Sequence, residues 1–139
     1  SMGGFGALRT GLAYSRNYSK IAALSSALII HQLRDMKPED TNPMANYAYY
    51  ANIFGDLQTA QERDCNPEVL VRQKLAAGEK LPEIFMACGS EDFLIEPNRA
   101  FRDFLKASGV PCAYHESPGI HDWKFWNEYL EPAIAWMVG

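Results

Sequence analysis

The sequence is poor in cysteine, with three in 139 residues. Cys65, Cys88 and Cys112 are odd in number and widely spaced. They therefore exclude a disulfide framework and match no zinc-binding pattern. Unpaired cysteines are typical of a reducing compartment, so we expect a cytoplasmic protein.

An excess of positive charge is also missing. Thirteen Lys and Arg residues stand against 17 Asp and Glu residues, which gives a net charge of −4. This balance argues against a nucleic-acid backbone or an anionic membrane surface as the main partner. The longest apolar stretch, residues 22–30, contains two serines and is far too short to span a bilayer. We therefore expect neither nucleic acid nor a membrane as a partner.

The chain contains no internal repeat and no low-complexity tract. Hydrophobic residues make up 47% and charged residues 22%, both close to the average of globular proteins. Disordered and fibrous classes are thereby excluded, and the length suits one compact domain.

Helical and strand patterns alternate along the chain. Residues 66 and 67, Asn followed by Pro, form a typical helix start, and Gly78 and Gly109 are typical helix ends. In the first half the patterns predict a helix over 5–14, a strand over 20–24, a loop with at most a helical turn over 25–43, and helices over 44–54 and 67–77. In the second half they predict a strand over 82–88, a helix over 97–108, a strand over 110–116 and a helix over 122–137.

The last predicted helix carries an apolar series at spacings of three and four. This series predicts a face packed in the core, and Pro132 is expected to bend or break the helix. Its members are Trp123, Trp126, Leu130, Ile134 and Met137.

This order of elements predicts an α/β fold with a parallel sheet, in which ligands bind at the C-terminal ends of the strands. Three strands are few for such a sheet, since about four to six are usual. We therefore expect the chain to be part of a larger fold.

Three residues fall where such a fold places reactive groups. Ser1 precedes a glycine-rich helix start, Asp92 follows the second strand, and His121 follows the third. The order Ser, Asp, His is that of α/β-hydrolases. A serine hydroxyl needs a base to become a nucleophile, a histidine can accept and return the proton, and an aspartate orients the imidazole.

Three segments carry a family resemblance over essentially the whole chain. They are Ser-Met-Gly-Gly-Phe-Gly-Ala-Leu at 1–8, Gly-Ser-Glu-Asp-Phe-Leu at 89–94 and Ser-Pro-Gly-Ile-His-Asp-Trp-Lys-Phe-Trp at 117–126. The first resembles the second half of a nucleophile elbow, and the others resemble acid and histidine loops. Together they are similar to the tributyrin esterase and esterase D-like group of α/β-hydrolases. The wider circle of this group includes S-formylglutathione hydrolases, acetylxylan and feruloyl esterases, and mycolyltransferases.

The resemblance implies a serine carboxylesterase acting on short acyl esters, with no metal and no organic cofactor. Ser1, Asp92 and His121 would be catalytic, and the backbone N–H of Met2 would be an oxyanion donor. The family's upstream strands are absent, so residues 1–139 are expected to be the C-terminal portion of one α/β-hydrolase domain. The missing N-terminal half, or a second copy of the chain, is then the expected protein partner.

Several alternatives remain open at this point. The enzyme can be a carbohydrate acetyl or feruloyl esterase, or the chain can be an inert fragment that associates through its open sheet edge. Ser1 also allows an N-terminal nucleophile hydrolase, although those enzymes have stacked antiparallel sheets. The dipeptide at 1–2 can also remain from a removed tag.

Other side chains have competing interpretations. Glu91 and Asp122 rival Asp92 as the acid, and His121 can instead cap the last helix. His31 is expected at the surface rather than in an acyl pocket. A structural role is expected for His115, and Cys88 is expected to be a buried apolar residue.

Overall fold

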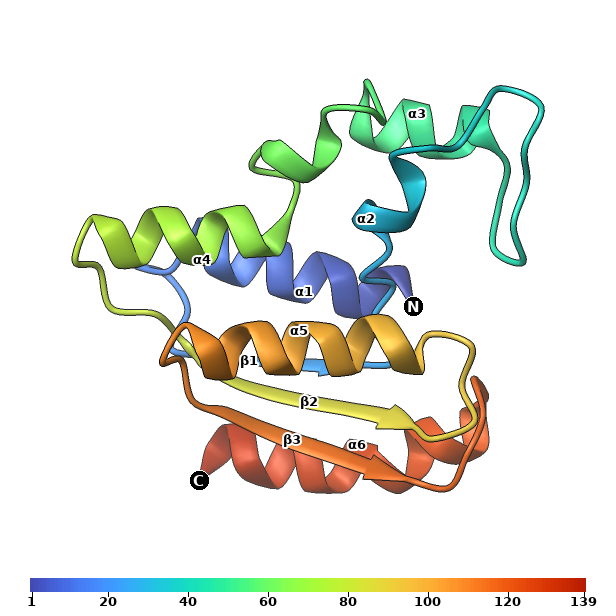
Figure 1. The fold of residues 1–139 in the computed structure, drawn as a ribbon. Helices are drawn as coiled ribbons and strands as arrows, with labels where there is room; N and C mark the ends of the chain where they lie inside the picture. The colour runs from blue at the N-terminus through green and yellow to red at the C-terminus, as the bar shows by residue number, and fades with distance from the viewer.

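The computed structural model describes all 139 residues and contains one sheet of three parallel strands (Figure 1). The strands are β1 (Lys20–Leu24), β2 (Glu83–Gly89) and β3 (Cys112–Ser117), adjacent in that order. Ile21 pairs with Ile84, and Gly89 pairs with Ser117. The parallel sheet confirms the predicted α/β fold and does not fit the stacked antiparallel sheets of N-terminal nucleophile hydrolases.

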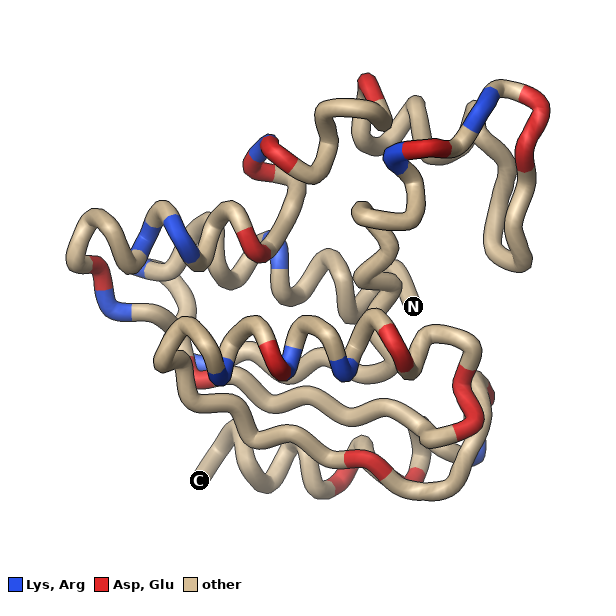
Figure 2. The backbone as a smooth tube through the Cα atoms, in the orientation of Figure 1, with Lys and Arg blue, Asp and Glu red and all other residues tan.

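Helices cover both faces of the sheet. Helices α1 (Met2–Ala13) and α5 (Ile95–Ala107) lie on one face, and α6 (Trp123–Val138) lies on the other (Figure 1). Helix α4 (Pro67–Ala76) packs against α1, one layer farther from the sheet. Acidic and basic residues are interspersed along α5, whereas the acidic residue of α4 lies in its first turn and the basic residues lie toward its other end (Figure 2).

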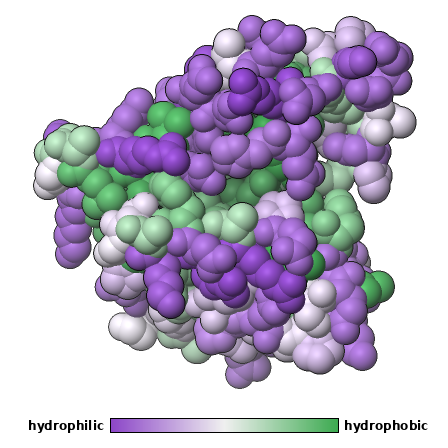
Figure 3. Space-filling view, in the orientation of Figure 1, coloured by the Kyte–Doolittle hydropathy of each residue, from purple (hydrophilic) through white to green (hydrophobic).

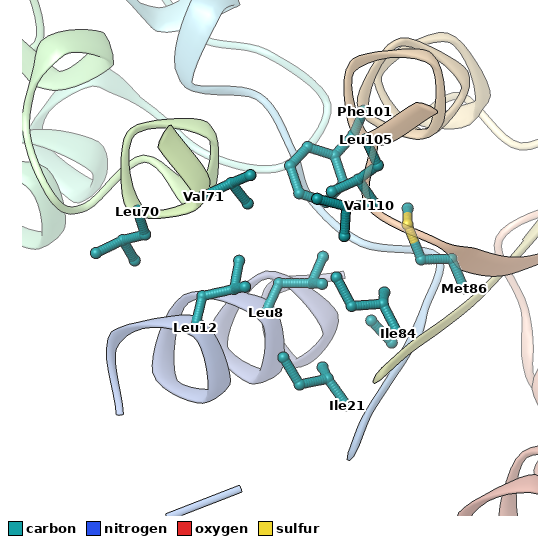
Figure 4. Packing of buried hydrophobic residues seen from close by; sticks show 11 residues of the cluster. Leu8, Leu12, Ile21, Leu70, Val71, Ile84, Met86, Phe101, Leu105 and Val110 are labelled. Atoms are coloured by element: carbon teal, nitrogen blue, oxygen red, sulfur yellow. The ribbon is translucent and has the colours of Figure 1, made fainter. Parts of the chain in front are cut away.

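The largest apolar cluster fills the space between the sheet, α1, α4 and α5 (Figure 4). Alternate residues of β2 face opposite sides, so that Ile84 and Met86 join this cluster while Phe85 and Ala87 face α6. In the space-filling view an apolar band lies between α4 and α5, with hydrophilic residues on either side (Figure 3). The sheet is therefore held by apolar packing on both faces.

The segment between β1 and α4 forms a small lobe of short helices. It contains α2 (Ile30–Leu33), α3 (Tyr47–Phe54) and a 3-10 turn, η1 (Ala60–Glu62). The helical turn expected within 25–43 is α2. Helix α3 begins at Tyr47 and not at residue 44, because the Asn46 side chain accepts a hydrogen bond from the Tyr49 N–H at 3.0 Å and caps it there.

Most predicted boundaries hold to within three residues. The strand predicted at 20–24 is confirmed as β1, and Asn66 caps α4 with Pro67 at its first position, as predicted. Helix α1 begins earlier than predicted, at Met2, and α5 begins at Ile95. Helix α6 continues through Pro132 as one element.

The prediction for the buried face of α6 was wrong except for Trp126, which packs against the cluster between α6 and the sheet. Trp123 is 74% exposed, and Leu130, Ile134 and Met137 are exposed as well. A second apolar series with the same helical spacing packs on the sheet instead: Phe125, Tyr129, Ala133 and Trp136. Spacing shows which residues share a face but does not decide which of two apolar faces is covered. None of the helices is long and apolar enough to cross a lipid bilayer.

Candidate active site

Ser1 lies at the N-terminal end of α1, beside the C-terminal end of the sheet. Its carbonyl oxygen accepts hydrogen bonds from Phe5 N–H at 3.2 Å and from Ala27 N–H at 2.8 Å. The first bond belongs to the helix, and the second ties Ser1 to the segment that follows β1. The Ser1 side chain makes no capping bond to the helix, and its Oγ hydrogen-bonds to His121 Nε2. The hydroxyl is therefore fixed in place yet directed away from its own helix.

His121 lies in the loop between β3 and α6 and connects Ser1 to Asp92. Its Nδ1 donates a hydrogen bond to Asp92 Oδ2 at 2.8 Å. Because an ionised carboxylate can only accept, Nδ1 carries the proton, and Nε2 is then free to accept from Ser1 Oγ. The imidazole also contacts the rings of Phe93 and Trp126, each with its centroid 5.0 Å away.

Asp92 is buried and hydrogen-bonded through both of its carboxylate oxygens. Its side chain is 0% exposed, and its second oxygen, Oδ1, accepts a hydrogen bond from the Leu94 N–H at 2.8 Å. A buried carboxylate needs such partners, because desolvation otherwise disfavours its charge. Each oxygen therefore has one donor, which fixes the carboxylate's orientation.

The two rival carboxylates do not touch the imidazole. Glu91 Oε2 accepts from the Gly119 N–H at 2.7 Å, and Asp122 Oδ1 accepts from the Phe125 N–H at 3.0 Å as the cap of α6. Since Asp122 caps the helix, His121 does not. Of the three neighbouring acids, only Asp92 hydrogen-bonds to the His121 imidazole.

Met2 is the first residue of α1, so its N–H has no carbonyl acceptor within the helix. A free N–H next to a serine Oγ is the arrangement that an oxyanion donor requires. The role of Met2 as a donor stays a prediction.

Two depressions lie near these elements. A groove of about 470 Å³ runs from Ser1 along β1 and α6, lined by Ala22, Leu24, Trp123, Trp126 and Leu130 among others. A hollow of about 340 Å³ lies between α2, α4 and α5 and includes neither Ser1, Asp92 nor His121. Only the groove contacts the Ser1 side of the site.

Three other residues noted in the sequence, His31, His115 and Cys88, lie outside the hydrogen bonds that join Ser1, His121 and Asp92. His31 lines the 340 Å³ hollow, lies at the surface as expected, and contacts Glu68 through Nε2 at 3.1 Å. His115 packs on the ring of Phe85, with centroids 4.8 Å apart. Cys88 is buried, as expected, and burial raises the pKa of its thiol to about 12. The structure contains no group of three or more His, Cys, Asp or Glu side chains arranged to hold a metal ion.

Ser25 is a supporting residue that sequence reasoning missed. It follows β1 with a φ of 46°, a conformation uncommon outside glycine, and its Oγ accepts a hydrogen bond from Trp126 Nε1 at 3.0 Å. This bond holds the indole that packs against His121. A serine after a strand carries no signal for such a role, because the contact joins residues 101 positions apart.

Comparison with known proteins places this geometry in a family. Residues 1–137 match the model of a family described as "Putative esterase". An acetyl esterase of Caldicellulosiruptor saccharolyticus is 45% identical over 137 residues, which cover 99% of this chain and 52% of the relative. The chain thus spans about half the length of that relative.

Solved structures of esterases agree with this family assignment. An S-formylglutathione hydrolase of Staphylococcus aureus superposes with a TM-score of 0.83 at 29% identity, over 100% of this chain and 52% of that one. A fluorophosphonate-binding serine hydrolase of the same species gives 0.84 at 29% identity with the same coverage. A ferulic acid esterase gives 0.65 at 25% identity, over 99% and 48%. With its parallel sheet and nearly its whole length matched, the chain belongs to the putative esterase family and has an α/β-hydrolase fold.

Proposed function

We propose that the chain carries the catalytic residues of a serine carboxylesterase that hydrolyses short-chain acyl esters. The observation that carries the proposal is the continuous series of hydrogen bonds from Ser1 Oγ through His121 to Asp92. In this assignment Ser1 is the nucleophile, His121 is the general base and then the general acid, and Asp92 orients the imidazole and stabilises its cation.

Acylation follows from that geometry. As Ser1 Oγ bonds to the ester carbonyl carbon, its proton passes to His121 Nε2. The tetrahedral intermediate then collapses, the bond to the leaving alcohol breaks, and Nε2 returns the proton to that alcohol. The products of this half-reaction are a free alcohol and an acyl group esterified to Ser1.

Deacylation uses the same atoms with water as the nucleophile. His121 Nε2 takes a proton from the water as its oxygen bonds to the acyl carbon, and it then protonates Ser1 Oγ as the acyl bond breaks. A carboxylic acid leaves and the free enzyme is restored. The Met2 N–H would stabilise the oxyanion in both halves, and such a donor is typically worth about 3–4 kcal/mol.

We further propose that residues 1–139 are the C-terminal portion of one α/β-hydrolase domain. The outer edge of β1 has no neighbouring strand, and the exposed apolar face of α6 borders the groove beside it. Exposed apolar surface of this kind is typical of an interface. An upstream half that pairs with β1 would cover both, and "complete domain" below means these residues joined to that half.

The substrate assignment is supported by the relatives. The 45% identity to an acetyl esterase favours a small acyl group, whereas the likeness to a ferulic acid esterase keeps a carbohydrate acetyl or feruloyl ester as the second candidate. A small-molecule ester is the proposed ligand in either case. The three unpaired cysteines support a cytoplasmic location.

Intact-protein mass spectrometry with a fluorophosphonate probe tests the proposal. We expect one adduct on Ser1 in the complete domain and none in Ser1→Ala. An adduct that persists in Ser1→Ala, or its absence from the complete domain, would refute Ser1 as the nucleophile. The same measurement on the 139-residue chain alone distinguishes an inert fragment, which stays unlabelled, from a half that assembles the site by itself.

A further inference from the structure

We propose that Glu91 is a positioning residue that holds the histidine loop in register with the acid loop. This inference rests on the proposed function, because its effect on activity requires Asp92 and His121 to act together. The Glu91 carboxylate itself forms no hydrogen bond with Ser1 or His121 and would act only through the position of the two loops.

The contact is a reciprocal pair of hydrogen bonds, which we call the Glu91 clasp. The Glu91 N–H donates to the Gly119 carbonyl oxygen at 3.0 Å, and the Gly119 N–H donates to Glu91 Oε2 at 2.7 Å. The Ser90 hydroxyl donates to the same Oε2 at 2.6 Å. One residue of the acid loop thus satisfies both backbone groups of one residue in the histidine loop.

The clasp is placed where it affects both proposed catalytic groups. Glu91 directly precedes Asp92, and Gly119 lies two residues before His121. Strand pairing ends at Gly89 and Ser117, so beyond that point the sheet no longer fixes the two loops. In this proposal the clasp sets the separation of Asp92 and His121.

Few other hydrogen bonds join the two loops. The Ser90 N–H donates to the Ser117 carbonyl at 2.9 Å, directly beyond the paired strands. The only others are the two bonds of the clasp and the bond from His121 to Asp92 itself. Of these bonds, the one from Gly119 N–H depends on the Glu91 side chain, so that Glu91→Ala removes it and leaves the backbone bond from Glu91 N–H in place.

The charge of Glu91 strengthens this contact. Hydrogen bonds from the Ser90 hydroxyl and the Gly119 amide hold the pKa of Glu91 below its usual value. The carboxylate is therefore ionised at neutral pH and accepts charge-assisted hydrogen bonds, which solvent weakens because Glu91 is exposed. A glutamine at this position would keep an acceptor oxygen but lose the charge.

Steady-state kinetics on the complete domain test the inference. We expect Glu91→Ala to lower kcat for a short acyl ester by about tenfold to a hundredfold, because a loop displacement near 1 Å has an effect of this size. KM should stay close to its original value, since the clasp does not contact the ester. Glu91→Gln should recover most of the loss. The matched control is Glu79→Ala, which removes a carboxylate bound to Lys74 at the opposite end of the sheet.

An unchanged kcat in Glu91→Ala, with or without a lower Tm, would overturn the inference, since it would leave Glu91 a stabilising contact only. Equal losses in Glu91→Gln and Glu91→Ala would also overturn it. If Glu91→Ala does not fold, Glu91→Asp withdraws the carboxylate by one methylene and should give the same selective fall in kcat.

Failure of the proposed function is recognised separately. Hydrolysis that survives Ser1→Ala would refute the nucleophile but not the clasp. The positioning role of Glu91 is then tested by the downfield NMR resonance of the His121 Nδ1 proton. Loss of this resonance in Glu91→Ala but not in Glu79→Ala supports positioning, and an unchanged resonance contradicts it.

Discussion

Replacing Gly89 with alanine tests how closely the acid and histidine loops must approach each other. A Cβ at this position would lie 2.2 Å from the Gly119 carbonyl oxygen and 2.6 Å from its carbon. Ordinary contact begins at 3.4 Å. Gly89 and Gly119 must therefore separate by the difference, 1.2 Å, to accept one methyl group. Gly119 is itself closely packed, because a Cβ at that position would lie 2.8 Å from Phe125 Cδ2.

The expected effect is on both activity and stability. A displacement of 1.2 Å should move His121 relative to Ser1 and Asp92, and a shift of about 1 Å can reduce turnover by about a hundredfold. Overpacking of this kind costs about 1–3 kcal/mol of stability. We expect both effects in steady-state hydrolysis of a short acyl ester and in thermal unfolding of the complete domain.

Gly6→Ala is the matched control, because a Cβ at Gly6 meets nothing within 4 Å. An alanine inside α1 should keep kcat unchanged and raise stability by about 0.5–1 kcal/mol. Wild-type kcat and Tm in Gly89→Ala would refute the argument that contact at Gly89 sets the position of the histidine loop.

Three further predictions concern single residues. Asp92→Asn should lower kcat by about 10⁴-fold, because the amide can donate to Nδ1 and so favours the wrong tautomer; steady-state hydrolysis checks this, and a loss of less than tenfold would contradict it. Asn66→Ala should destabilise the chain by about 1 kcal/mol in a denaturant titration, whereas Asn66→Ser should retain most of the capping bond to the Glu68 N–H. Burial raises the pKa of the Cys88 thiol to about 12. The free energy of unfolding should therefore fall as pH rises from 9 toward 12, because in this range only the unfolded chain loses the thiol proton. Cys88→Ala should make this pH dependence weaker, and an identical slope in both proteins would contradict the prediction.

The sequence predicts the framework better than the packing. Strand β1 and the capped start of α4 follow from local signals, namely a short apolar run and an Asn-Pro pair. The exposed face of α6 could not be predicted, because two apolar series share the helical period and only the sheet selects between them. Helix periodicity is a property of one segment, whereas burial depends on its neighbours.

The residues of the candidate site could likewise be predicted only in part from local signals. Chain order and loop position singled out Asp92 and His121, but position alone did not separate Asp92 from Glu91 and Asp122. The separation depends on backbone geometry: each of these three carboxylates accepts from a different backbone N–H, and only Asp92 also accepts a hydrogen bond from the imidazole. Contacts such as Ser25 to Trp126 join distant segments and leave no local pattern.

All three tryptophans of the chain lie on α6, at positions 123, 126 and 136. Intrinsic fluorescence therefore reports on this one helix and on little else. Trp123, which is exposed, should shift its emission to shorter wavelength when another surface covers it, and Trp126 should respond to changes around His121. Local unfolding of α2 or α3 would be silent in the same spectrum. The chain thus contains an unlabelled optical reporter for the face that borders Ser1, and Trp123 emission would show whether the proposed upstream half covers that face.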